Sequence, residues 1–133
     1  MLFRSGLLGA SKNIGVSSIV QAALRLHGQM MLCGQASATV AWLCLRDGIE
    51  PRVLAADARR VREVQQVLVR GRGGPGVALW PYQDLPPDHA AFEAANLTTI
   101  AGLWHADADS VHFQPEKAVP PDEWRAAAER APV

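Results

Sequence analysis

The segment from about Gly28 to Arg46 restricts the fold more than any other part of this 133-residue sequence. It is a helix-length run with almost no polar residues, and it stops at Asp47-Gly48, where glycine can adopt the left-handed conformation that ends a helix. A helix without a polar face must be enclosed by protein or ligand on every side. The run is shorter than the roughly 20 apolar residues of a membrane span and contains Gln35 and Ser37. We therefore expect a buried helix and no membrane segment.

Small residues line one face of this expected helix, namely Gly34, Ser37, Ala38 and Ala41. They would let another backbone or a flat ring system approach closely. From the spacing alone, ordinary close helix packing is the favoured interpretation. Gln35 beside them can form hydrogen bonds in the core but cannot act as a base.

The composition argues for a packed core and against a nucleic-acid partner. Apolar residues make up 49% of the chain, and 13 basic residues balance 13 acidic ones. The charges are interspersed, so no phosphate-binding stripe is expected. Cys33 and Cys44 lie too far apart on one helix to form a disulfide. No metal site is expected, because His89, His105 and His112 have no cysteine or carboxylate at ligand spacing.

Two further helices are expected before a glycine-rich stretch. Ser17 or Ser18 can cap a short helix that ends near Leu24. Another helix is expected over about 57–70. Its apolar stripe comprises Val61, Val64, Leu68 and Val53, and the charged residues Arg59, Arg60, Arg62 and Glu63 are expected to face water.

The stretch Gly71-Arg72-Gly73-Gly74-Pro75-Gly76 predicts a break in the chain. It is not a phosphate cradle, because no strand is expected before it and no Lys-Ser/Thr opens a helix after it. We expect one segment over 1–71, a linker over 72–79 and a second segment over 80–133. In the second segment, 77–80 predicts a short extended piece, and helices are expected over about 87–103 and 121–131.

Three short motifs connect the first segment to a known family. Lys12-Asn13-Ile14-Gly15, Arg25-Leu26-His27 and Gly34-Gln35-Ala36 occur in this order. Their order and spacing resemble the closing segment of FAD-dependent oxidoreductases of the fumarate-reductase-like superfamily, over roughly 7–71. The resemblance implies a loop under the flavin ring and a buried helix whose N-terminus points at that ring. It also favours a flavin-side role for the small-residue face over simple helix packing.

The resemblance implies FAD as the cofactor and a set of contacts to it. The implied cofactor-binding residues are Asn13, Gly15, Arg25, Leu26, His27, Gly28 and Gln29. Backbone N–H groups and the helix dipole at the helix start would stabilise the N1–C2=O edge of the flavin, where charge accumulates on reduction. Arg25 would add positive charge there. His27 is the candidate catalytic acid or base, with a structural histidine as the alternative.

The second segment resembles a surface-layer homology (SLH) repeat. The matching positions are Tyr82-Gln83-Asp84-Leu85-Pro86, His89, Phe92, Ile100, Gly102, Phe113-Gln114-Pro115, Val119 and Glu123. Pro120-Pro121-Asp122-Glu123 stands where the polymer-binding motif of SLH repeats has Thr-Arg ahead of Ala-Glu, so the charged contact is lost. For Asp84 and Glu123, turn and helix-capping roles are favoured over acid/base work.

We therefore expect a mainly α fold, the C-terminal helical portion of an α/β FAD-binding domain followed by a small SLH-like helical segment. A dinucleotide-binding G-x-G-x-x-G after a strand is absent, so the chain is expected to be an inactive fragment of an oxidoreductase. Its expected partners are the N-terminal Rossmann part of the same protein and a small-molecule substrate that the sequence does not identify. Residues 2–5 match the translation of a common sequencing-adapter end, which predicts a truncated reading frame. The alternative is a non-catalytic surface-binding or interaction module through the SLH-like segment.

Overall fold

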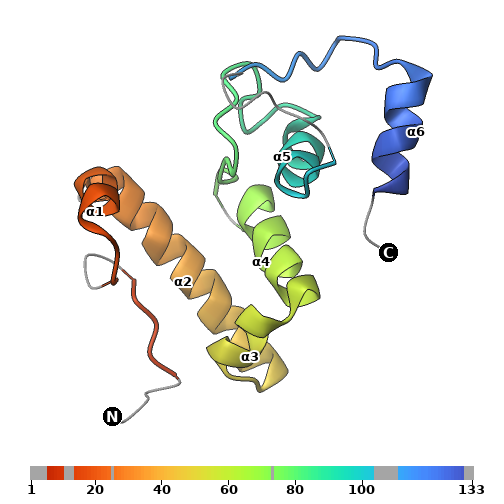
Figure 1. The fold of residues 1–133 in the computed structure, drawn as a ribbon. Coiled ribbons are helices and arrows are strands. Elements are labelled where there is room, and N and C mark those ends of the chain that lie inside the picture. Colours follow the sequence, from red (N-terminus) through yellow and green to blue (C-terminus); the bar gives the residue numbers. More distant parts are fainter. Residues whose placement is uncertain (1–5, 11–13, 25, 73, 104–110, 131–133) are drawn as a thin grey trace. The chain divides into compact units, whose positions relative to one another are not determined.

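The computed structural model describes residues 6–10, 14–24, 26–72, 74–103 and 111–130. Within these residues the regular secondary structure consists of helices, without a strand (Figure 1). This confirms the expected mainly α fold. The helices are α1 (Ser18–Leu24), α2 (His27–Asp47), α3 (Pro51–Ala56), α4 (Ala58–Arg70), α5 (Phe92–Ile100) and α6 (Pro121–Glu129). The chain forms two compact units, residues 1–68 and 69–133.

The first two helices begin and end close to the predicted positions. Ser17 caps α1, with its hydroxyl accepting from the Val20 N–H at 3.4 Å and its carbonyl accepting from the Gln21 N–H at 2.8 Å. α2 extends one residue beyond the expected range at each end. Gly48 has φ 65° and donates its N–H to the Cys44 carbonyl, which is the left-handed cap predicted from the sequence.

The short helix α3 was not predicted. Pro51 occupies its first turn, where the missing N–H of proline costs nothing, and the Glu50 carbonyl accepts from Val53 and Leu54. Asp57 has an extended backbone that separates α3 from α4. The assignment of Val53 to the apolar stripe of the next helix was wrong, because Val53 lies in α3 and is 51% exposed.

The stripe of α4 packs as expected, but part of its charged face does not simply face water. Val64 and Leu68 are buried, whereas the Arg60 and Glu63 side chains form ion pairs with the end of α2. Arg60 lies 2.6 Å from Asp47, and Glu63 lies 2.7 Å from Arg46. Hydrogen bonding to Arg46, and then to Arg60, lowers the pKa of Asp47 to about 2. Exposed pairs of this kind add little stability.

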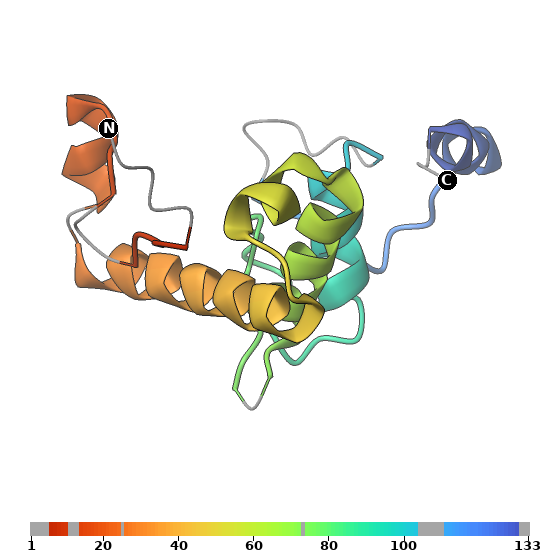
Figure 2. The same cartoon turned by 90° about the horizontal axis from the view of Figure 1, so that it is seen from below.

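The long helix α2 is buried on one side only within the described residues. Met30, Leu43 and Cys44 of α2 are buried, and so are Leu54 of α3 and Val64 and Leu68 of α4. In contrast, Met31 is 76% exposed and Leu45 is 85% exposed. The expectation that this helix is enclosed on every side was therefore wrong for the described part of the chain, because one side of α2 is open. α1 and α3 pack against α2 near its start and its end, respectively (Figures 1 and 2).

The second unit has a core of its own. Val69, Tyr82, Leu85, Phe92 and Ala95 pack together there. The glycine-rich stretch folds tightly onto the end of α4, since a Cβ at Gly76 would collide with the Val69 carbonyl. Leu79 and Trp80 donate their N–H groups to the Asn96 side chain, at 2.8 and 2.9 Å. The extended piece predicted at 77–80 is therefore no strand; a buried amide side chain takes the place of a partner strand.

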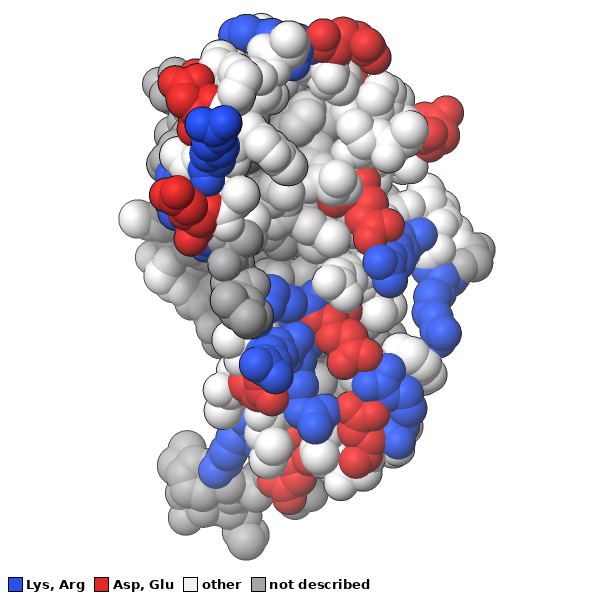
Figure 3. Space-filling view, turned by 90° about the vertical axis from the view of Figure 1, so that its right-hand side faces the viewer, with Lys and Arg blue, Asp and Glu red and all other residues white. Residues whose placement is uncertain are grey.

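The described surface carries both charges interleaved. On the face shown in Figure 3, Lys and Arg side chains alternate with Asp and Glu side chains, without a large area of one sign. Among the helices that the structure describes, none is both long enough and apolar enough to span a bilayer.

Candidate functional site

The start of α2 is the principal candidate site. Its N-cap residue is Leu26, which has an extended backbone (φ −72°, ψ 141°) and offers no side-chain hydrogen bond to the helix. The first regular helical bond runs from the Met30 N–H to the Leu26 carbonyl at 3.2 Å. The first turn contains no acidic side chain. Its early N–H groups therefore point outward with the positive end of the helix dipole behind them.

The residues that line this helix start are all accessible. Leu26, His27, Gly28 and Gln29 are exposed, so their backbone donors and the His27 imidazole can reach a ligand. A Cβ at Gly28 or at Gly15 would meet no atom of the chain within 4 Å. Neither glycine is therefore required for packing within the described residues. This openness fits the predicted close approach of a cofactor.

Asn13 and Arg25, which the sequence places on either side of α1, lie outside the described residues. Their predicted contacts, an amide beside Gly15 and a positive charge near the flavin edge, stay predictions. The structure does place Ile14 and Gly15 before α1 and Leu26 two residues after its end. Because α1 packs against α2, the two expected halves of the site belong to one compact unit.

Ser17 and Ser18 stand where the resembled family often has a histidine after the loop glycine. The Ser17 hydroxyl caps α1 and Ser18 is its first residue, so both have structural roles in starting that helix. Of the predicted site residues that the structure describes, His27 alone has a side chain suited to proton transfer near neutral pH.

The small-residue face of α2 contacts the backbone of another chain segment. The resemblance had favoured a flavin-side role for this face. The Ser37 hydroxyl donates a 2.6 Å hydrogen bond to the Gly9 carbonyl. A Cβ at Gly34 would lie 3.2 Å from the Ala10 carbonyl oxygen. Residues 9 and 10 thus contact α2 where the small residues allow it. At Gly34 and Ser37 this face packs against a non-helical segment, not against the second helix that the spacing alone favoured. Gln35 is exposed, and the core role expected for it was wrong.

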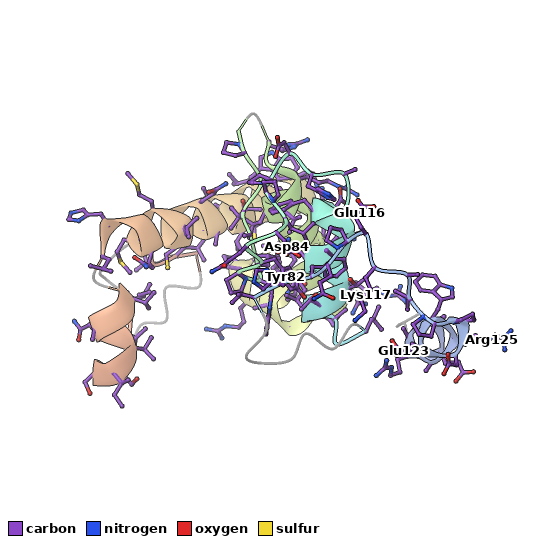
Figure 4. The ribbon with its side chains drawn as sticks, turned by 90° about the horizontal axis from the view of Figure 1, so that it is seen from above. Tyr82, Asp84, Glu116, Lys117, Glu123 and Arg125 are labelled. Atoms are coloured by element: carbon purple, nitrogen blue, oxygen red, sulfur yellow. The ribbon has the colours of Figure 1, made fainter. Side chains whose placement is uncertain are left out.

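The second unit contains a polar network around the SLH-like positions. Asp84 accepts hydrogen bonds from the Phe113 N–H at 2.8 Å and the Gln114 N–H at 2.7 Å. These bonds, the one from Phe113 first, lower the pKa of Asp84. They hold the segment before α6 against the core, where the Tyr82 and Phe113 rings meet edge to face. Asp84 therefore has the turn-stabilising role that the sequence favoured (Figure 4).

The other SLH-like polar positions lie at the surface or in turns. His89 accepts the Ala91 N–H through Nδ1 at 3.1 Å, which supports the turn before α5. Glu123 lies in the first turn of α6, where a carboxylate suits the helix dipole. Figure 4 shows Glu123 and Arg125 on α6 and Glu116 and Lys117 on the preceding loop. All four are exposed. Within the described ranges, no three or more His, Cys, Asp or Glu residues gather as metal ligands would.

Comparison with known proteins adds one finding. Residues 4–68 match the family model described as FAD dependent oxidoreductase, a little under half of the chain. The match contains all the residues assigned to the candidate site and ends where the first unit ends. This part of the chain is related in sequence to a family whose members depend on FAD. No curated protein and no solved structure gave a significant match.

Proposed function

We propose that residues 1–71 are the closing part of the FAD-binding domain of an oxidoreductase. They would supply the loop and the helix start on the isoalloxazine side of the cofactor. The observation that carries the proposal is the family match over residues 4–68. The geometry of α2 supports it, because a helix start without a side-chain cap or an acidic first turn suits a carbonyl or an anion.

In this proposal each site residue has a stated task. The N–H groups from Leu26 to Gln29 contact the N1–C2=O edge, and Arg25 adds positive charge beside it. Asn13 and Gly15 form the loop against the ring, and His27 moves a proton to or from the flavin or the substrate. Bound FAD would supply the hydride chemistry, and these residues would orient its ring.

The chain would need the N-terminal Rossmann part of the same protein. FAD recognition rests on a pyrophosphate bound at a glycine-rich turn between a strand and a helix. The one glycine-rich stretch of this sequence follows the helix α4, and no helix begins again before Phe92. The exposed Met31 and Leu45 side chains fit a surface that another part of the parent protein covers.

Titration of the purified chain with FAD tests whether it is a partial site. We expect no saturable quenching of flavin fluorescence and no oxidoreductase turnover. One-to-one saturable binding would contradict the proposal that the chain lacks the dinucleotide-binding part.

The assignment of the site is tested in the FAD-loaded parent protein with Arg25→Ala. Charge-assisted bonds contribute about 1.5–3 kcal/mol, so flavin affinity or reduction should weaken by roughly ten- to hundredfold. Arg59→Ala is the matched control, since Arg59 is an exposed arginine of α4. Equal flavin content and reduction potential in both variants would remove Arg25 from the site.

A second candidate function belongs to the second unit, whose own core and Asp84 contacts favour an independent module. It would be a non-catalytic surface-binding or interaction module of the SLH-like kind. The loss of the Thr-Arg contact at Pro120-Pro121 makes wall binding the weaker form of this candidate, and a structural appendage of the oxidoreductase the better one. Retention of the chain on cell-wall polysaccharide in a pull-down would favour the binding module.

A further inference from the structure

One contact links the middle of α2 to the loop before α1. Ser37 lies ten residues after the first residue of α2, about 15 Å along the helix at 1.5 Å per residue. Its hydroxyl donates to the Gly9 carbonyl at 2.6 Å, and the bond is partly buried. Gly34, nearly one turn earlier, lets the Ala10 carbonyl come close. Ser37 thus fixes the position of segment 9–10 along the helix.

The same segment is in contact with the candidate cofactor loop. A Cβ on Gly9 would lie 2.5 Å from the Ile14 Cγ2 atom, so the Ile14 side chain already rests against the Gly9 backbone. Ile14 is followed by Gly15, a predicted cofactor-binding residue. A displacement of Gly9 would therefore move Ile14 and Gly15 relative to α2. The start of that same helix carries Leu26, His27 and Gly28.

We propose that Ser37 is a positioning residue of the flavin-side site. Its hydroxyl holds residues 9 and 10 in one register against α2 and, through Gly9, holds Ile14, so that Gly15 and the N–H groups at the helix start face the same flavin. This inference rests on the proposed function of the first unit. Ser37 itself touches neither cofactor nor substrate; it acts through Gly9 and Ile14.

Thr39 offers a matched control on the same helix. Its hydroxyl donates to the Gln35 carbonyl at 2.9 Å, a bond within α2 that reaches no other segment. Ser37→Ala and Thr39→Ala each delete one hydroxyl from α2, but only the first removes a contact to segment 9–10. Ser37→Thr keeps a hydroxyl at the position and should rescue the loss.

The first measurement is backbone 15N NMR relaxation in this chain, which reports the motion of an amide whether or not its N–H is hydrogen-bonded. In Ser37→Ala we expect the order parameters of residues 9, 10, 14 and 15 to fall from about 0.85 to about 0.6, because segment 9–10 loses its bond to α2. Thr39→Ala and Ser37→Thr should match the unsubstituted chain. Equal order parameters in Ser37→Ala and Thr39→Ala would overturn the inference.

The second measurement is the flavin absorption spectrum and midpoint potential of the FAD-loaded parent protein. We expect Ser37→Ala to shift both, with rescue by Ser37→Thr and no shift in Thr39→Ala. A flavin that responds to Arg25→Ala but not to Ser37→Ala would overturn this inference and leave the proposed function standing. An unsubstituted parent protein without flavin would overturn the proposed function and, with it, the role of Ser37.

Discussion

Replacement of Asn96 by alanine should destabilise the second unit more than any other single polar substitution we can identify in it. Asn96 is 0% exposed and lies on α5. Its Oδ1 atom accepts from the N–H groups of Leu79 and Trp80, and its Nδ2 atom donates to the Phe92 carbonyl at 2.9 Å. The side chain thereby holds a non-helical segment against α5 where a sheet or helix partner is missing.

The expected magnitude follows from these three bonds. Asn96→Ala leaves two backbone N–H groups without their acceptor, and each such group costs about 1–3 kcal/mol when it stays buried. Leu79 and Trp80 are only half-buried, so water can reach part of the space that the amide leaves. The Phe92 carbonyl still takes part in α5, which limits the cost of losing Nδ2. We therefore expect a loss of about 2–4 kcal/mol in the free energy of unfolding.

Urea unfolding followed by circular dichroism measures the total loss, and amide exchange at Leu79 and Trp80 locates it. Thr98→Ala is the control, because the Thr98 hydroxyl is on the same helix but donates only to carbonyls of α5. It should change stability by less than about 0.5 kcal/mol. A loss below about 1 kcal/mol for Asn96→Ala, or unchanged exchange at Leu79 and Trp80, would refute the view that this amide organises the unit.

Three further outcomes are expected. The pKa of Asp84 is lowered in the fold. Its contribution to the free energy of unfolding is therefore present above the ordinary carboxyl pKa of about 4 and is lost as the pH falls through the lowered pKa. Asp84→Asn should flatten the acid side of the profile of stability against pH, measured between about pH 2 and 6. Burial, and then Asp47, raises the pKa of the Cys44 thiol, so iodoacetamide at pH 8 should alkylate half-buried Cys33 first in a peptide-mapping time course. Gly76→Ala should lower the unfolding midpoint well below that of Gly74→Ala, because only the Cβ at position 76 collides with the Val69 carbonyl; equal midpoints would contradict the tight loop.

The helices that the sequence predicted well are those with local start and stop signals. Ser17 and Gly48 mark the ends of α1 and α2 through bonds to their own neighbours, so a reading of the sequence finds them. α3 was not predicted, because its six residues, Pro51–Ala56, offer too little periodicity to distinguish them from the apolar stripe of the following helix. The conformation of the irregular segment 77–80 could not be predicted, because its hydrogen-bond acceptor, Asn96, is distant in the sequence.

For the candidate site, too, the sequence predicted some features and not others. The family motifs named the residues around α1 and the start of α2, and the described ones are exposed; their role at a cofactor stays a prediction. The contact from Ser37 to Gly9 could not be predicted, since it joins segments 28 positions apart. The small residues at Gly34 and Ser37 were its only sequence signal, and they fit a ring as well as a backbone.

Two features of the first unit favour the same role. The start of α2 has no side-chain cap, and Met31 and Leu45 on the same helix are exposed. Free donors at a helix start suit a polar ligand, whereas exposed apolar side chains suit a protein surface. A unit that contributes one side of a cofactor site, and needs the rest of its domain to complete it, would have both features at once.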